Sequence, residues 1–350
     1  MHRRWFTSAV AAGCLAAACT SSADAPRATT SASSGVTSPT TPTVAALNWQ
    51  AMRNPIYAPP HMVKDLAVVR ETGRWFLYAS ERWEPSEPDD RHAVSSTDLE
   101  HWEPVAATQD QVFNSPDITR ANDGTWRMTH QRTIGAGAKA VDRIVVSTAQ
   151  SLAGPWSDAR EILGDAFSGQ RLIDGAVAET PQGLFLVAKR GDRSLVPQLS
   201  EVFHSPSGSI DGPWKHLGTA DVGWAENYQF LRIDGTWHLL VTTIPIHHPT
   251  LFKMVGDPKA AASWLHWRKV AQLAVPAENW NSPSDGPDSS PGFTHEAANS
   301  AYLVDERAND GYFYLFYAGS TELSTHDGRG LAHIGVARSR DLRAWAAPPG

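Results

Sequence analysis

Hydrophobic and polar residues alternate along most of the chain in short runs that are broken by turn residues. The clearest example runs from Glu226 to Ile233, turns at Asp234 and Gly235, and returns through residues 236–241. An Asp-Gly pair between apolar runs is a strong signal for a tight β-hairpin, because glycine adopts the positive φ that such turns need. The stretch therefore predicts two antiparallel strands.

This hairpin pattern occurs five times along the chain. Each copy contains an apolar run, a turn glycine and an aromatic residue soon after it, and each is followed by a second segment that ends in tryptophan. The turn glycines are Gly73, Gly124, Gly183, Gly235 and Gly311, and the closing tryptophans are Trp102, Trp156, Trp214, Trp267 and Trp345. Two hairpins in about fifty residues are typical of a propeller blade. We therefore predict an all-β fold, a five-bladed β-propeller of four-stranded blades packed by tryptophan.

The N-terminal segment has a different composition. Residues 1–18 combine a basic start with a short apolar run, which predicts a signal peptide, and the small residues before Cys19 resemble a bacterial lipobox. We expect Cys19 to be the lipidated first residue of an exported cell-surface lipoprotein; an ordinary secretory signal is the alternative. Residues 20–45 are rich in Ser, Thr and Pro and predict a disordered tether, which leaves residues 46–350 for the propeller.

The charge balance and the cysteine count exclude some partners and sites. The chain has 30 Lys and Arg against 37 Asp and Glu, and no basic run alternates with aromatic residues, so we expect no nucleic-acid partner. Both cysteines, Cys14 and Cys19, lie in the N-terminal segment, so the predicted propeller has neither a disulfide nor a cysteine metal site. We expect a monomer that contacts a membrane only through an N-terminal lipid anchor.

Four acidic residues recur near the start of the first strand of successive repeats. They are Asp65, Asp117, Asp174 and Glu226, at spacings of 52, 57 and 52 residues. Because the first strand of each blade lines the central channel, these carboxylates are expected to converge at one end of it. Neighbouring carboxylates push their pKa values apart, which lets one act as acid and another as base in glycosidic bond cleavage. Alternatively they are structural acids that pair with basic residues such as Lys64, Arg120, Arg171 and Arg232.

At these positions the chain resembles glycoside hydrolase family 43, five-bladed propeller glycosidases that include arabinanases, arabinofuranosidases and xylosidases. The resemblance covers about Asn54–Trp345. It implies an inverting acid/base hydrolase of a pentose-containing oligo- or polysaccharide such as arabinan, arabinoxylan or xylan. By this resemblance Asp65 would be the general base and Glu226 the general acid. Asp174 would orient the acid and raise its pKa, and Asp117 would contact the substrate.

Further residues are expected near this site. Trp83 and Trp224 lie in loops or at strand entrances, where their rings could stack on sugars. His295, on the fifth repeat, is expected to contact substrate. In similar arabinanases a histidine of this blade lies at a central ion, so His295 is also a candidate ligand for Ca²⁺ in the channel, although no cofactor is required. Residues that follow inner strands and could line the site are Gln131, Lys189, Arg190 and His204.

Two other classes of function remain open from the sequence. A non-catalytic carbohydrate-binding surface lipoprotein would keep the funnel but perform no turnover. A propeller that serves only as a protein-interaction platform would have its channel acids consumed by arginine pairs and an apolar patch on an outer face.

Overall fold

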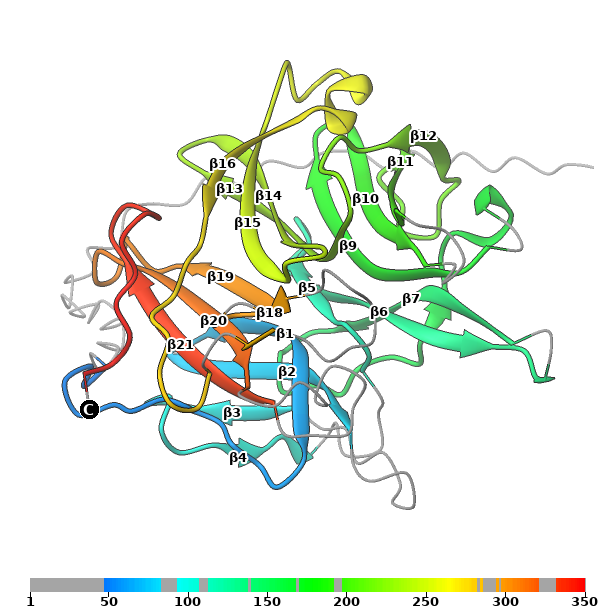
Figure 1. Ribbon diagram of the computed structural model, residues 1–350. Coiled ribbons are helices and arrows are strands. Elements are labelled where there is room, and N and C mark those ends of the chain that lie inside the picture. The colour runs from blue at the N-terminus through cyan, green and yellow to red at the C-terminus, as the bar shows by residue number, and fades with distance from the viewer. Residues whose placement is uncertain are drawn as a thin grey trace, which may run out of the picture. The chain divides into compact units, whose positions relative to one another are not determined.

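The computed structural model describes residues 47–82, 93–106, 113–137, 140–167, 170–191, 197–281, 284–285, 294–295, 297–320 and 332–349. The chain divides into the units Met1–Thr43 and Val44–Gly350, and all described residues belong to the second. Within them, five antiparallel sheets follow one another around a central axis (Figure 1). The predicted all-β, five-bladed propeller is therefore confirmed, with four strands in most blades.

Each blade is a meander in which consecutive strands are neighbours. The first and second blades comprise β1 (Met62–Glu71), β2 (Arg74–Arg82), β3 (Val94–Ser96) and β4 (Glu103–Pro104), then β5 (Asp117–Arg120), β6 (Trp126–Ile134), β7 (Val141–Ala149) and β8 (Arg160–Glu161). The third and fourth comprise β9 (Leu172–Thr180), β10 (Gly183–Arg190), β11 (Leu199–Ser205) and β12 (Lys215–Thr219), then β13 (Ala225–Ile233), β14 (Thr236–Thr243), β15 (His248–Met254) and β16 (Trp267–Gln272). The fifth comprises β19 (Ala301–Asp305), β20 (Phe313–Gly319) and β21 (His333–Ser339).

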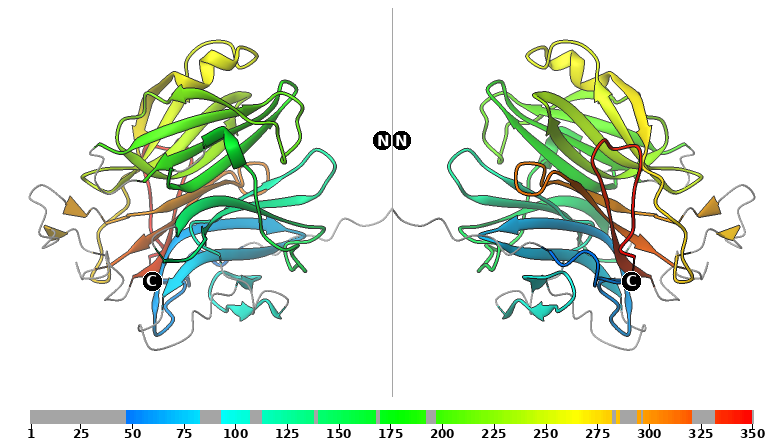
Figure 2. Two further views of the ribbon diagram at one scale, coloured as in Figure 1. Left: turned by 90° about the vertical axis from the view of Figure 1, so that its right-hand side faces the viewer. Right: turned by 90° about the vertical axis from the view of Figure 1, so that its left-hand side faces the viewer.

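A few short elements complete the described structure. A hairpin of β17 (Ser284–Asp285) and β18 (Thr294–His295) precedes the fifth blade and projects from the ring of blades (Figure 2). Two 3₁₀ helices occur in the described residues, η3 (Gly164–Phe167) and η4 (Ala261–Leu265). No helix in this part of the chain has the length and apolar character that crossing a membrane would need.

The outer edge of the fifth blade is completed by segments from both ends of the described propeller. Tyr57 forms an antiparallel bridge to one end of β21, and Ala346 forms one to the other end. Asn54 adds a paired contact in between, because its Oδ1 accepts the Val336 N–H at 2.9 Å and its Nδ2 donates to the Val336 carbonyl at 3.0 Å. These hydrogen bonds close the ring between residues that are far apart in sequence.

Aromatic side chains fill the spaces between neighbouring sheets. Trp75 is fully buried and packs on Phe316 of the fifth blade, with ring centroids 5.4 Å apart. Phe185 and Trp264 stack nearly parallel at 4.0 Å where the third and fourth blades meet. Burying a large apolar side chain stabilises a fold by about 1.5–3 kcal/mol, so repeated rings of this kind hold the blades together. Four of the five closing tryptophans are also buried: Trp156, Trp214, Trp267 and Trp345.

Candidate active site

The inner strands of the first, third and fourth blades share a bulge near their start. The register with the second strand shifts between Lys64 and Ala67 in β1, between Ile173 and Ala176 in β9, and between Glu226 and Gln229 in β13. Each bulge contains one residue with positive φ: Asp65 at 49°, Asp174 at 55° and Asn227 at 51°. Asp and Asn accept this left-handed backbone more readily than other non-glycine residues, because their short polar side chains can hydrogen-bond locally. The residue types at these positions are thus the ones that the bulge permits.

Ser115 holds the same position in the second blade. Its φ is 46°, and the Gln131 N–H donates to the Asn114 carbonyl at 2.9 Å, so the ladder continues on the far side of Ser115 as it does beyond each bulge. The structurally equivalent residues are therefore Asp65, Ser115, Asp174 and Asn227. The sequence repeat aligned Asp117 and Glu226 instead, two residues after and one residue before the equivalent positions. A bulge adds a residue to one strand and shifts the side chains around it, so the spacing between repeats does not show which residue occupies the equivalent position.

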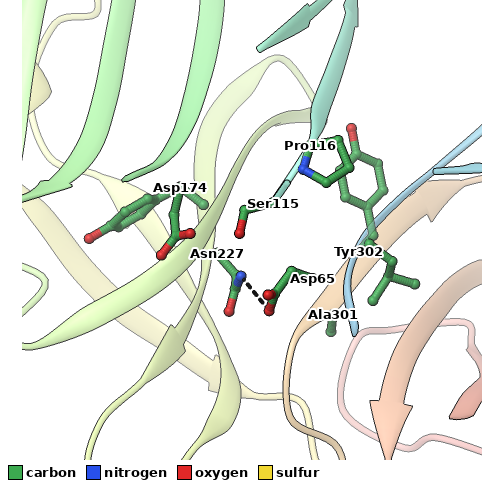
Figure 3. A pocket seen from close by; sticks show the side chains of 9 residues that line it. Asp65, Ser115, Pro116, Asp174, Asn227, Ala301 and Tyr302 are labelled. Atoms are coloured by element: carbon green, nitrogen blue, oxygen red, sulfur yellow. Dashed lines mark hydrogen bonds between the residues drawn. The ribbon is translucent and has the colours of Figure 1, made fainter. Parts of the chain in front are cut away.

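The four equivalent side chains surround a small cavity on the central axis. Asp65, Ser115, Asp174 and Asn227 point toward a shared space, and the cavity they line has a volume of about 10 Å³ (Figure 3). This is about the size that one water molecule needs. Asn227 Nδ2 donates to Asp65 Oδ1 at 3.0 Å, and the Asp65 N–H donates to Ser300 Oγ at 2.9 Å. Asp65 is therefore held by groups from the fourth and fifth blades.

Two lysines neutralise the carboxylates at this end of the channel. Lys189 Nζ donates a hydrogen bond to Glu226 Oε2 and lies 3.6 Å from Asp174 Oδ2. Lys64 Nζ lies 3.4 Å from Asp65 Oδ2. The site thus brings together the three predicted catalytic carboxylates, each beside an ammonium group. The alternative prediction was that these acids pair with basic residues. Asp65 does pair with Lys64, and Asp174 and Glu226 pair with Lys189.

The environments of Asp174 and Glu226 move their pKa values in opposite directions. Burial raises the pKa of Asp174, and the nearby Glu226 and Asp65 raise it further, against the opposing effect of Lys189. Burial also favours a high pKa for Glu226, but the Lys189 ammonium, with His247 and Lys64, outweighs burial and lowers it to about 2. Of these two acids, Glu226 therefore ionises at the lower pH, and Asp174 keeps its proton to a higher pH.

Asp117 lies deeper in the propeller than the sequence predicted. Its side chain is only 3% exposed and does not line the cavity. Oδ2 accepts the Val177 N–H at 3.3 Å, and Oδ1 accepts the Tyr302 hydroxyl hydrogen at 3.1 Å. Asp117 therefore joins the second, third and fifth blades, and Ser115 presents the side chain that reaches the cavity from the second blade.

The remaining predicted site residues are placed less fully. Trp224 is half-buried in the turn that leads into β13, next to the strand that carries Glu226. His295 is the last residue of β18, but its side chain lies outside the described part of the structure, and so do Trp83 and Cys19. Their expected contacts with substrate or lipid stay predictions.

Several residues near the site had weak or no signals in the sequence. Asn227 and Ser115 were not predicted, because the sequence repeat assigned their positions to the nearby acids Glu226 and Asp117. His247 is buried in the turn between β14 and β15 and contributes to the low pKa of Glu226. Lys189 was one of four polar residues expected to line the site, and it lies within β10; the signal that could have singled it out is a lysine directly after the apolar run of residues 184–188.

The described residues show no cluster of acidic or histidine side chains for a metal ion. Calcium is bound by six to eight oxygen atoms, and the structure, in the residues it describes, contains no group of three His, Cys, Asp or Glu side chains that could hold a metal ion. The carboxylates at the channel end face ammonium groups instead. The side chain of the candidate ligand His295 lies outside the described part of the structure, so a calcium site there stays a prediction.

Comparisons with known proteins agree on the fold. No protein-family model matches the chain, and no curated protein matches it in sequence. Among solved structures, a thermostable family-43 glycoside hydrolase is 13% identical with a TM-score of 0.54, over 84% of this chain and 96% of that one. An α-L-arabinofuranosidase from Lactobacillus brevis is also 13% identical, with a TM-score of 0.53 over 84% and 96% of the two chains. A xylan β-1,4-xylosidase from Bacillus halodurans C-125 is 18% identical, with a TM-score of 0.53 over 85% of this chain and 56% of that one. At such identities the likeness shows a shared five-bladed fold.

Proposed function

We propose that this protein is a glycoside hydrolase that cleaves a pentose-containing oligo- or polysaccharide. The observation that carries the proposal is the meeting of Asp65, Asp174 and Glu226, from three inner strands, at one end of the channel. Glycosidic bond cleavage needs two carboxyl groups in different protonation states. The fold shared with xylosidases and an arabinofuranosidase supports a pentose as the sugar.

In the proposed inverting reaction, Asp65 activates the water that attacks the anomeric carbon, and Glu226 protonates the leaving oxygen. Asn227 holds Asp65 through the hydrogen bond to Oδ1, and a carboxylate that accepts this bond stays oriented toward the cavity. Asp174 acts on the acid directly through its charge, and both carboxyl groups contact Lys189. Trp224 is proposed to stack on a sugar ring beside Glu226. His295 and Trp83 are proposed to contact the substrate, whereas Asp117 is enclosed between blades.

We also propose that the N-terminal segment exports and anchors the protein. The basic and apolar residues 1–18 would direct secretion, Cys19 would be lipidated, and residues 20–45 would separate the propeller from a membrane. An exported glycosidase of this kind would meet polysaccharide outside the cell, as a monomer held to the surface.

A second candidate function is favoured by one specific contact. Because Lys189 holds Glu226 ionised, the free protein has no protonated Glu226 to act as general acid at neutral pH. A carbohydrate-binding surface protein without turnover would need no such acid. The arginine pairs that a pure interaction platform would show are not found at these acids, whose described cationic partners are lysines.

The deciding experiment measures turnover by the purified protein on arabinans, xylans and aryl-pentosides. We expect Glu226→Gln and Asp65→Asn to lower kcat/KM by on the order of 10²–10⁴, the usual range for loss of a general acid or base. Glu103→Gln and Asp158→Asn, which change exposed carboxylates on outer parts of two blades, should leave the rate unchanged. Turnover that survives both site substitutions would contradict the assignment of Glu226 and Asp65 as acid and base, and no turnover by the parent would contradict the hydrolase. Oligosaccharide binding without turnover would favour the second candidate.

A further inference from the structure

Lys189 occupies a position that is uncharged in the blades with the same inner-strand geometry. In the ladder, Ile173 faces Lys189 in the third blade, as Lys64 faces Ser80 in the first and Glu226 faces Thr242 in the fourth. The lysine thus stands where the first and fourth blades have a small hydroxyl side chain and the second blade has Gln131. The fold of a blade does not require an ammonium group at this position. The contacts that Lys189 makes indicate the reason for its presence.

The contacts of Lys189 connect acids from two blades. Its side chain is only 8% exposed, it donates a hydrogen bond to Glu226 Oε2, and it lies 3.6 Å from Asp174 Oδ2. Charges at such depth interact far more strongly than charges in water. An ammonium in direct contact with one carboxylate and farther from a second one favours ionisation of the first.

The other charged and titratable groups around Glu226 do not replace this contact. Lys64 and Asp65 face it from β1, and their own charges lie 3.4 Å apart. Asp174 faces it from β9 and opposes its ionisation, and the imidazole of His247 approaches from the turn between β14 and β15. Lys189 is the cation that contacts Glu226 directly. The Asp174 side chain is 6% exposed and that of Glu226 is 18% exposed, so water stabilises the charge of Asp174 less.

We propose that Lys189 decides which of these two buried acids ionises first, favouring ionisation of Glu226 over that of Asp174 in the free protein. Lys189 is then a positioning residue for the acid of the proposed reaction, on which this inference rests. An inverting glycosidase needs its acid protonated before the leaving oxygen departs. Consequently, Lys189 restrains hydrolysis until a bound ligand draws the ammonium away from Glu226.

The test is a titration of the Glu226 carboxyl group by NMR on protein with ¹³C-labelled glutamate side chains, with the signal assigned from Glu226→Gln. In the parent protein we expect Glu226 to stay ionised down to about pH 3. In Lys189→Met its pKa should rise above the ordinary glutamate value, and Lys189→Arg should restore the low value because it restores the cation. Lys215→Met, on the exposed outer strand β12, is the matched control and should leave the Glu226 titration unmoved.

The same variants give a kinetic readout. Each unit of pKa changes the protonated fraction of Glu226 tenfold at a pH above both values, so Lys189→Met should raise kcat/KM on a neutral aryl-pentoside at pH 6 by at least tenfold. A merely structural lysine would instead lower the rate. The parent titration tests the inference even if Lys189→Met does not fold. An ordinary or raised pKa of Glu226 in the parent, or one that is unmoved in a folded Lys189→Met, would overturn it. If the titrations behave as expected while no variant turns over any glycoside, the inference stands and the hydrolase proposal fails.

Discussion

The first and fourth blades use the same backbone geometry for opposite charges. In both inner strands the bulge directly follows a residue that pairs with the second strand. This residue is Lys64 in β1 and Glu226 in β13. The next residues, Asp65 and Asn227, both have left-handed backbone and hydrogen-bond to each other at 3.0 Å. The bulge is thus a property of the repeat, whereas the chemistry is set by which side chain each blade places on it.

The largest expected effect is on kcat/KM, and it distinguishes Glu226 in the fourth blade from Lys64 at the equivalent position in the first. Glu226→Gln should lower kcat/KM on a pentoside by on the order of 10² or more, because it removes the proposed acid. Lys64→Gln should lower it less than tenfold, because Lys64 contacts the base Asp65 and its side chain is 31% exposed to water, which weakens the pair. Steady-state kinetics of both variants make the comparison. Equal losses would mean that the two blades contribute equally to turnover.

The second blade differs from the first and fourth. Its carboxyl group, Asp117, is buried two residues after Ser115, the position that corresponds to Asp65 and Asn227. Burial raises the pKa of Asp117 from 3.8 to about 7, against hydrogen bonds from the Val177 N–H and the Tyr302 hydroxyl. Because the folded state holds this proton more tightly than the unfolded chain, the contribution of Asp117 to stability is complete below pH 4 and is lost as pH rises to about 7. Each unit corresponds to about 1.4 kcal/mol, so the loss amounts to a few kcal/mol.

Urea unfolding of the parent and Asp117→Asn at pH 4, 6 and 8 measures this loss. We expect Asp117→Asn to be close to the parent in stability at pH 4, because a neutral carboxyl group and an amide each offer one carbonyl oxygen as acceptor and one donor group. As the pH approaches 8, the parent should become less stable than Asp117→Asn, because only the parent loses the contribution of the Asp117 proton. A difference that is constant across this range would show that Asp117 is already ionised at pH 4.

A smaller effect tests the contact between the two bulges directly. Asn227→Asp replaces a donor with a carboxylate against Asp65, which should lower the free energy of unfolding at pH 7 by about 1.5–3 kcal/mol, the value of a hydrogen bond to a charged group. Adding Asp65→Asn to it exchanges the two residues between the blades and recreates one Asn–Asp pair. The double variant should regain at least half of the lost stability in urea unfolding while remaining inactive. Additive losses would mean that the blades are not interchangeable in structure.

The smallest effect concerns the hairpin turns at the other end of these two inner strands. Thr72 and Gly73 turn in the first blade with φ of 48° and 84°, and Asp234 and Gly235 turn in the fourth with 49° and 74°. A β-branched residue at positive φ is strained, whereas Asn and Asp tolerate it. Thr72→Asn should therefore raise stability by about 0.5–1 kcal/mol, and Asp234→Thr should lower it by a similar amount. Thermal unfolding of both variants at neutral pH is sufficient, and shifts of the same sign would contradict the turn argument.

The repeat was readable from sequence because its signals are local. The turn at Asp234 and Gly235 forms where the residue pair predicts, and aromatic residues such as Trp75 and Trp267 pack between sheets as their periodic placement indicated. Local signals of this kind reflect turn geometry and apolar spacing, which a single sequence displays directly.

The details of the site were not readable because they depend on contacts between blades. The alignment of Asp117 with Asp65 ignored the bulge, which moves Ser115 into the cavity and Asp117 into the interior. The pairing of Lys189 with Glu226 joins β10 to β13, and no spacing rule connects these strands. Likewise, the repeat placed Trp345 at the outer edge of the fifth blade, next to Ala346, but no local signal predicted that Tyr57 would pair with Ile334 on the same strand.

The seam at β21 also has a consequence for the order of folding. Asn54 meets Val336 across 282 residues of chain, so this contact forms only after nearly all of the propeller has been made. Closing a loop of that length carries a large entropic cost, which the individual hairpins do not face. Until β21 appears, the first blade and Asn54 have no partner on that side, and a chain interrupted at this stage is an open arc with an exposed strand edge. A short peptide with the sequence of residues 53–57 would compete for that edge during refolding and would leave the closed ring untouched.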